Sequence, residues 1–184
     1  MKRTFVMLIV AMSGFATGAL AQVDTSHPGY YPIEAMGLFA EDELDVNVDL
    51  QGAMLQVAAG AMQKDGEDAD IAELASKLER VRVQVGSPQG IDPTAISSKF
   101  DGAVKTMEGA GWNRILSVID DDARIYLFAR ERGGAIVGLT ALVNDDDELV
   151  LANVVGTIDP VLLGRVIAKM DRLPNLETYM DITE

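Results

Sequence analysis

Two short acidic runs in the second half of the chain are the residues best suited to chemistry. The first is 120–122, and the second, 145–147, stands between Asn144 and Glu148. Carboxylate oxygens are ligands that Ca²⁺ prefers in proteins. Each run separates two segments that resemble strands, and alternate turns of an antiparallel meander lie at the same end of a sheet. The sequence therefore predicts a candidate Ca²⁺ site, with Asp120, Asp121, Asp122, Asp145, Asp146 and Asp147 as ligands.

The same runs also have a purely structural interpretation. Asp and Asn are favoured in tight turns because their side chains accept hydrogen bonds from the backbone of the turn. The acids also lack the spacing of an EF-hand loop, in which ligands recur at fixed positions. A calcium site and two ordinary turns are both kept as hypotheses.

Other catalytic chemistry lacks its usual residues. The chain has no cysteine, and its only histidine is His27, beside Pro28. Ser–His hydrolysis, Cys–His proteolysis and histidine-based metal sites therefore have no complete set of residues. We expect a non-catalytic protein without a cofactor other than the candidate Ca²⁺. A pair of carboxylates can hydrolyse a glycosidic bond, so a carboxylate-dependent hydrolase is the alternative.

A polar stripe on one predicted strand is the remaining candidate site. The strand around 81–85 alternates valines with Arg80, Arg82 and Gln84. Because side chains alternate across a strand, the polar ones should share one exposed face. A basic stripe on an acidic molecule predicts an interaction surface for a protein partner. The alternative is a solvated sheet edge whose charges discourage pairing with other strands.

The elements that position these residues follow from hydrophobic periodicity. Alternation predicts a strand over 44–50, and helical spacing of apolar residues predicts helices over 53–63 and 69–79. Asp92-Pro93 and Asp159-Pro160 each predict the start of a helix, with Asp as N-cap and Pro as the first helical residue. Between these two helices, the pattern predicts a four-stranded meander over 113–119, 124–130, 135–143 and 148–155.

This order of elements predicts an α+β fold. We expect a two-layer sandwich, with a mixed, mostly antiparallel sheet of about six strands and helices on one face. We expect a flexible lead-in over 22–43, a single domain over 44–175 and a C-terminal tail over 176–184. The lead-in contains His27-Pro28-Gly29 and Pro32 and ends in the acidic run 41–43, so the fold is expected to begin near Leu44.

The first 21 residues have the three parts of a secretory signal peptide. Lys2 and Arg3 form a positive start, an apolar stretch follows over 5–20, and Ala19-Leu20-Ala21 matches the small-x-small pattern of a cleavage site. We therefore predict cleavage after Ala21 and a periplasmic or secreted protein. No later segment approaches the length of a spanning helix, so no transmembrane anchor is expected after processing.

Charge narrows the class of partner. The formal net charge is −14, and it becomes more negative when Lys2 and Arg3 are removed with the signal peptide. Such a surface is repelled by phosphates of nucleic acids and by anionic lipids. We therefore predict no nucleic-acid partner, and a protein partner in the cell envelope.

Two consecutive segments carry a resemblance to a known family. Residues 135–143 run into 148–160, where Asn153, Gly156, Ile158 and Asp159 form a strand end and the start of a helix. This pattern resembles the bacterial domain-of-unknown-function family 4252. The resemblance implies a small exported α+β domain, often a lipoprotein, with no assigned activity. This chain departs from it in lacking a lipid-acceptor cysteine.

Together these features predict a non-catalytic exported binding or interaction protein, an accessory in envelope regulation. The alternatives are a Ca²⁺-modulated module that uses the acidic turns, and the carboxylate-dependent hydrolase.

Overall fold

The computed structural model describes residues 25–64, 69–120 and 123–169. The predicted signal peptide and its cleavage site, and the predicted tail over 176–184, lie outside the described residues. None of the described helices is both long and apolar enough to span a membrane.

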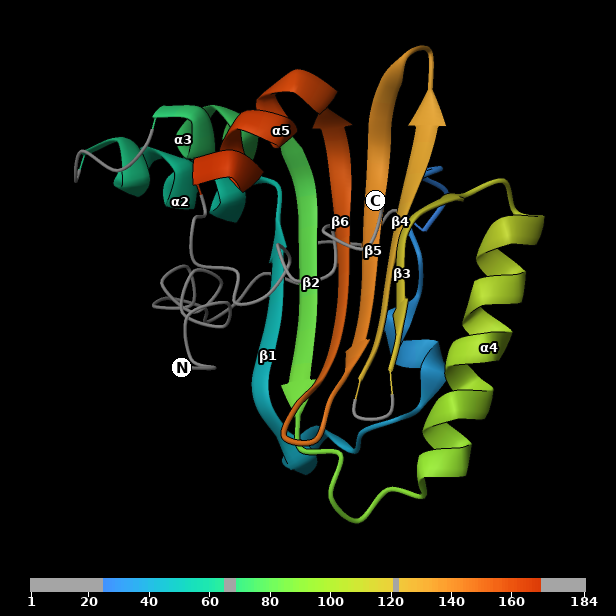
Figure 1. Ribbon diagram of the computed structural model, residues 1–184. Coiled ribbons are helices and arrows are strands. Elements are labelled where there is room, and N and C mark those ends of the chain that lie inside the picture. Colours follow the sequence, from blue (N-terminus) through green and yellow to red (C-terminus); the bar gives the residue numbers. More distant parts are fainter. Residues whose placement is uncertain (1–24, 65–68, 121–122, 170–184) are drawn as a thin grey trace.

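One antiparallel sheet organises the described chain (Figure 1). Its strands are β1 (Leu44–Gln51), β2 (Leu78–Gly86), β3 (Asn113–Ile119), β4 (Arg124–Arg132), β5 (Ala135–Asn144) and β6 (Leu149–Ile158). They lie in the order β1-β2-β6-β5-β4-β3, and every neighbouring pair is antiparallel. The predicted α+β class, the six strands and the four-stranded meander are confirmed, but the sheet is antiparallel throughout and not mixed.

Helices connect and complete the strands. The described helices are α2 (Ala53–Lys64), α3 (Ala69–Ser76), α4 (Pro93–Gly109) and α5 (Pro160–Lys169), with short 3-10 turns η1 (Ile33–Met36) and η2 (Glu41–Glu43). Asp92 caps α4 by accepting a hydrogen bond from the Thr94 N–H at 2.9 Å. Asp159 caps α5 by accepting from the N–H groups of Val161 and Leu162 at 2.7 and 3.1 Å. Both predicted caps are confirmed.

The helices cover both faces of the sheet, so the prediction of helices on one face is wrong. Leu55 of α2, Leu74 of α3 and Leu163 of α5 pack on the face that carries Val83 and Leu139. The buried side chains of α4 pack on the opposite face, against aromatic and leucine side chains of β4, β5 and β6: Tyr126, Phe128, Leu142, Leu149 and Leu151. The connection that contains α4 takes the chain from β2 to β3 at the far edge of the sheet, and α4 packs on the face that α2, α3 and α5 leave open.

A segment before the first strand also belongs to the core. We call residues 29–38 the strap; it lies on the same face of the sheet as α4 (Figure 1). Ile33 is fully buried, and Met36 and Leu38 are 8% and 6% exposed. The prediction that the fold begins near Leu44, after a flexible lead-in, is therefore wrong for the strap. The glycines and the proline of the strap suggest an irregular segment, but its apolar side chains include three core residues.

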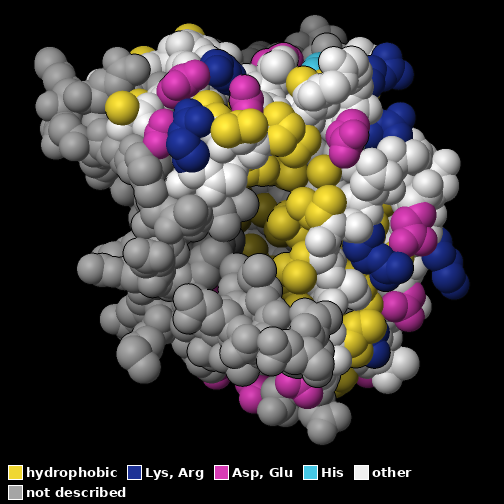
Figure 2. Space-filling model, turned by 45° about the horizontal axis from the view of Figure 1, so that its top comes forward, with side chains coloured by type: hydrophobic (Ala, Val, Ile, Leu, Met, Phe, Trp, Pro, Cys, Tyr) yellow, Lys and Arg dark blue, Asp and Glu magenta, His cyan; other side chains and the backbone are white. Residues whose placement is uncertain are grey.

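The face of the sheet that carries α2, α3 and α5 is only partly covered by these helices. Strand register places apolar side chains such as Leu127, Leu139, Ala141 and Val154 on it, and they are half-buried. Figure 2, in which the top of Figure 1 comes forward, shows hydrophobic side chains gathered around a hollow. Larger apolar side chains of the helices are also exposed, including Val57 of α2 and Val161 of α5.

The structure explains two residues of the family pattern at the end of β6, Gly156 and Ile158. At Gly156, φ is +152°, and an added Cβ would lie 2.5 Å from the Lys77 carbonyl oxygen and 2.7 Å from Leu78 Cα. Both contacts are with backbone, which cannot move aside as a flexible side chain can. Ile158 is 1% exposed in the core. Gly156 and Ile158 therefore serve folding at this position.

Candidate functional site

A groove lies between the strap and α4. Its volume is about 540 Å³. Tyr30, Tyr31 and Met36 of the strap form one wall, and α4 with the residues just after it forms the other, including Met107 and Trp112. Its size is in the range of small-molecule sites, and its lining is mainly apolar and aromatic, as in such sites.

Aromatic contacts shape one end of the groove. The rings of Tyr31 and Trp112 meet edge to face, with centroids 6.4 Å apart and planes at 79°. This geometry is favoured by the quadrupoles of the two rings. Trp112 is 5% exposed, and burial raises the pKa of the Tyr31 phenol. The phenol therefore stays neutral and able to donate a hydrogen bond at physiological pH.

Glycines allow the strap to lie directly on the sheet. A Cβ on Gly29 would lie 1.8 Å from the Val137 carbonyl oxygen, and one on Gly138 would lie 2.5 Å from Gly29 Cα and 2.8 Å from Trp112 Cη2. Only hydrogen atoms fit at both positions, so the two backbones are in contact. This contact sets the depth at which the strap and the indole ring sit.

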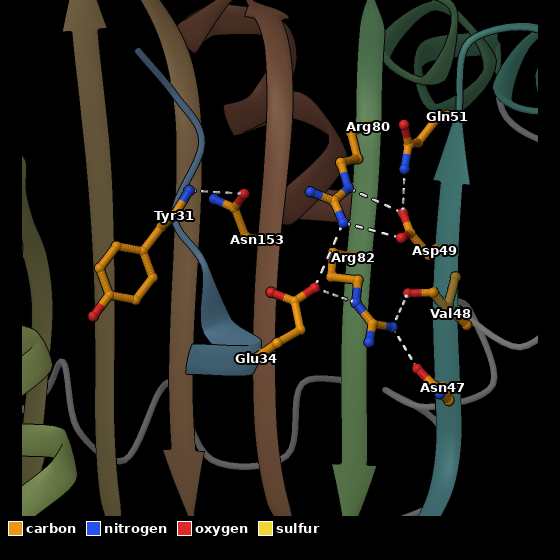
Figure 3. A network of polar contacts seen from close by, with 9 residues as sticks. All are labelled: Tyr31, Glu34, Asn47, Val48, Asp49, Gln51, Arg80, Arg82 and Asn153. Atoms are coloured by element: carbon orange, nitrogen blue, oxygen red, sulfur yellow. Dashed lines mark hydrogen bonds and ion pairs between the residues drawn. The ribbon is translucent and has the colours of Figure 1, made fainter. Parts of the chain in front are cut away.

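A buried asparagine ties the strap to the middle of the sheet (Figure 3). The Asn153 side chain is fully buried. Its Nδ2 donates to the carbonyl oxygens of Gly29 and Leu139 at 3.1 and 3.2 Å and to Thr140 Oγ1 at 3.0 Å. Its Oδ1 accepts from the Tyr31 N–H at 3.2 Å. The Asn153 amide thus satisfies the hydrogen-bonding needs of the Tyr31 N–H and the Gly29 carbonyl oxygen, which are shielded from solvent by the sheet.

Two arginines of β2, Arg80 and Arg82, also bind the strap, through Glu34 (Figure 3). Glu34 Oε1 accepts from Arg82 Nε at 2.6 Å and from Arg80 Nη2 at 3.5 Å. Asp49 of β1 binds Arg80 through both oxygens, each at 3.0 Å. Arg82 Nη1 also donates to the Val48 carbonyl oxygen at 3.0 Å. One carboxylate of the strap is therefore shared by two guanidinium groups.

The charges of this network stabilise one another. Burial opposes ionisation of Asp49, but hydrogen bonds from Arg80 and Gln51 outweigh it and lower the pKa of that carboxyl. Burial likewise opposes the charge of Arg80, but its hydrogen bonds with Asp49 raise the pKa of the guanidinium. The Tyr30 ring lies 5.3 Å from the Arg80 guanidinium carbon and adds a cation–π contact. Both groups are thus ionised under ordinary conditions.

This burial corrects the prediction for Arg80, Arg82 and Gln84. Arg80 and Gln84 are 7% and 9% exposed, and Arg82 is half-buried. The prediction that these residues form an exposed basic stripe is therefore wrong. Alternation correctly indicates that they share a face, but the strap covers that face and supplies the countercharge of Glu34. A partner residue so far away in sequence leaves no local signal.

The acidic turns lie at the same end of the sheet, as predicted. Arg124 pairs with both Ile119 and Asn144, and Asn144 pairs with Leu149, so the turns after β3 and β5 are level (Figure 1, lower end). Asp121 and Asp122 lie outside the described residues. Among those described, no group of three or more Asp, Glu, His or Cys is placed to hold a metal ion.

Hydrogen bonds within the second turn support its structural interpretation. Asp145 Oδ1 accepts from the N–H groups of Asp147 and Glu148, both at 2.8 Å. Gln89 donates to the Asp146 carbonyl oxygen at 2.8 Å. The Ca²⁺ hypothesis for Asp120, Asp145, Asp146 and Asp147 stays a prediction.

The only histidine lies outside the groove lining. His27 Nδ1 accepts from the Gly29 N–H at 3.1 Å, and Nε2 is 3.8 Å from Glu79 Oε1. His27 therefore binds the backbone at the first residue of the strap. The groove itself had a faint signal in the sequence, since Tyr30-Tyr31 and the only tryptophan, Trp112, are three of the ten aromatic residues of the chain.

Comparison with known proteins gives one match. A family model described as "Domain of unknown function (DUF4252)" matches residues 39–166, which is more than half of the chain. The match contains all six strands and α4 and begins just after the strap. No curated protein and no solved structure matches the chain.

Proposed function

Since this chain belongs to the DUF4252 family of domains of unknown function, we propose a function from its own geometry: it is a non-catalytic binding protein that holds an apolar ligand in the groove between the strap and α4. The observation that carries this proposal is the cavity of about 540 Å³ with its aromatic and aliphatic walls. Its volume lies within the range that is usual for small-molecule sites.

The walls of the groove are well fixed, which favours binding. The strap is joined to the sheet by Asn153, by Glu34 and by the Gly29–Gly138 contact. Rigid walls reduce the ordering cost of association, so more of the hydrophobic gain is realised as affinity. Binding an apolar ligand requires no catalytic histidine or cysteine, and the chain has one His and no Cys.

The proposed place of action is the cell envelope. The support is the predicted signal peptide over residues 1–21, with its positive start and small-x-small end. Mass spectrometry of the protein from the envelope fraction tests this, with an N-terminus at Gln22 as the expected result. An unprocessed N-terminus in the cytoplasmic fraction would refute export and leave the groove proposal standing.

The binding test uses Trp112, because it is the only tryptophan and lines the groove. Titration with 1-anilinonaphthalene-8-sulfonate should give energy transfer from the indole to the bound dye. Ala35→Phe should reduce dye binding at least tenfold, because Ala35 lines the groove and is exposed, so a phenyl ring there would take up space that the dye needs. Ala53→Phe is the matched control, since Ala53 is exposed at the start of α2, away from the lining. Equal binding by both variants would refute the groove as the site.

The predicted protein partner is tested with the same variants. Cross-linked capture from the envelope fraction is expected to recover one dominant partner with the wild-type protein and the Ala53→Phe variant. Its loss with Ala35→Phe would show that the partner, or the ligand that it carries, occupies the groove. Capture that is indifferent to Ala35→Phe would remove the groove from that interaction.

A further inference from the structure

The groove contains a single charged side chain among the described residues that line it. Lys99 of α4 is that residue, and the other lining side chains are apolar, aromatic or hydroxyl-bearing. No carboxylate lines the described walls, although the chain as a whole carries a formal charge of −14. The one charge that the lining contributes is thus opposite in sign to the net charge of the protein.

The ammonium group of Lys99 is held in a fixed place. Lys99 Nζ donates to the carbonyl oxygen of Met36 and, at 2.8 Å, to that of Gly37. Gly37 ends η1 in the left-handed conformation, with φ of +56°, which turns both carbonyl groups toward α4. An ammonium group has three N–H donors. These two acceptors leave one donor for a ligand in the groove.

The charge of the ligand follows from this arrangement. A cationic ligand would meet the Lys99 ammonium without a carboxylate to balance it. A neutral ligand would offer the remaining N–H donor only a neutral hydrogen bond. A carboxylate next to Nζ makes a charge-assisted hydrogen bond, which is stronger than a neutral one. A single negative charge suits the site best, because each further charge is repelled by the acidic protein surface.

The rest of the ligand must be apolar. Ala103, Met107, Tyr31 and Trp112 provide no further charge for a polar body. From these observations we propose that the ligand is an amphipathic monocarboxylate, with its carboxylate on Lys99 and its alkyl or aryl body between the strap and α4. This inference rests on the proposed function and adds the chemistry of its ligand.

A head-group series tests the inference. The probes are decanoate and decan-1-ol at neutral pH, below the concentrations at which they aggregate, with Trp112 fluorescence as readout. The wild-type protein should bind decanoate about tenfold more tightly than decan-1-ol, the factor expected for one charge-assisted hydrogen bond. Lys99→Gln should bind the two probes equally, and its binding of decan-1-ol shows that the groove still exists. Lys99→Arg should keep the preference for decanoate.

The control variant is Lys105→Gln. Lys105 lies on the same helix but is exposed and outside the groove lining, so its loss should leave the preference unchanged. Equal affinities of the wild type for the two probes, or a preference that survives in Lys99→Gln, would overturn the assignment of Lys99. Binding of neither probe to the wild type would instead refute the proposed function itself.

Discussion

Replacement of Asn153 by alanine tests how the strap is held. The Asn153 side chain is fully buried and makes four hydrogen bonds, two of which reach the strap. In the Ala variant, the Tyr31 N–H, the Gly29 carbonyl oxygen and the Thr140 hydroxyl each lose a partner. An unsatisfied buried polar group costs about 1–3 kcal/mol. Water can enter part of the vacated space, so we expect a loss of about 3 kcal/mol in the free energy of unfolding.

That loss is large compared with the stability of a domain. A typical domain is stable by about 5–15 kcal/mol, so the midpoint of urea unfolding should fall by roughly 1–2 M, with the slope unchanged. Trp112 fluorescence follows the unfolding. Asn113→Ala is the matched control, because Asn113 is exposed on the edge strand. We expect that control to lie within about 0.5 kcal/mol of the wild type.

Asn153→Asp separates hydrogen bonding from volume. The carboxylate has almost the size of the amide but no N–H donor, and it would face the carbonyl oxygens of Gly29 and Leu139. We expect this variant to be at least as unstable as the Ala variant. A loss below about 1 kcal/mol for Asn153→Ala, close to that of Asn113→Ala, would contradict the reasoning. It would mean that the strap is held by other contacts.

Three further predictions concern other parts of the fold. Gly156→Ala should destabilise the domain by about 2 kcal/mol or more, because the added Cβ would contact backbone atoms. Gly164 lies in open space on α5, so Gly164→Ala should stabilise the domain by up to about 1 kcal/mol. Melting temperatures of the two variants that shift in the same direction would contradict this. Since the pKa of Asp49 is lowered on folding from an ordinary 3.8, its stabilisation is present above that pH and is lost as the pH falls through the folded value. Stability measured against pH should therefore decline below about pH 4 in the wild type and less steeply in Asp49→Asn, and parallel curves would show that the Arg80 pair does not contribute. If the turns at 120–122 and 144–148 are only structural, the melting temperature should be equal in Ca²⁺ and in chelator, and a rise of several degrees in Ca²⁺ would support the calcium hypothesis.

Local patterns predicted the elements well, because each pattern acts over a few residues. Alternation identified β1, and Asp-Pro pairs identified the starts of α4 and α5. The meander followed from three turn signals rich in Asp, Asn and Gly. The sequence also indicated that Arg80, Arg82 and Gln84 share a face. In each case the physical cause lies within one element or one turn, so it can be read without knowledge of the rest of the chain.

The layers and the groove depended on the tertiary structure. Helix α4 lies on the face opposite α2, α3 and α5, and the strap lies in the same layer as α4. Glu34 and Arg80 are 46 residues apart in sequence, and Asn153 and Tyr31 are 122 apart. A polar face of a strand has the same alternation whether water or a distant segment covers it, so the burial of the arginines could not be read from the pattern.

The sequence by itself thus determined the strands, helices, caps and turns, because hydrophobic period and turn chemistry are local properties. Only the tertiary structure decided which segment covers the polar face of β2, and that choice created the groove. The physical reason is that Gly29, Glu34 and Tyr31 gain their contacts from the backbone, the arginines and the asparagine of strands that follow much later in the chain.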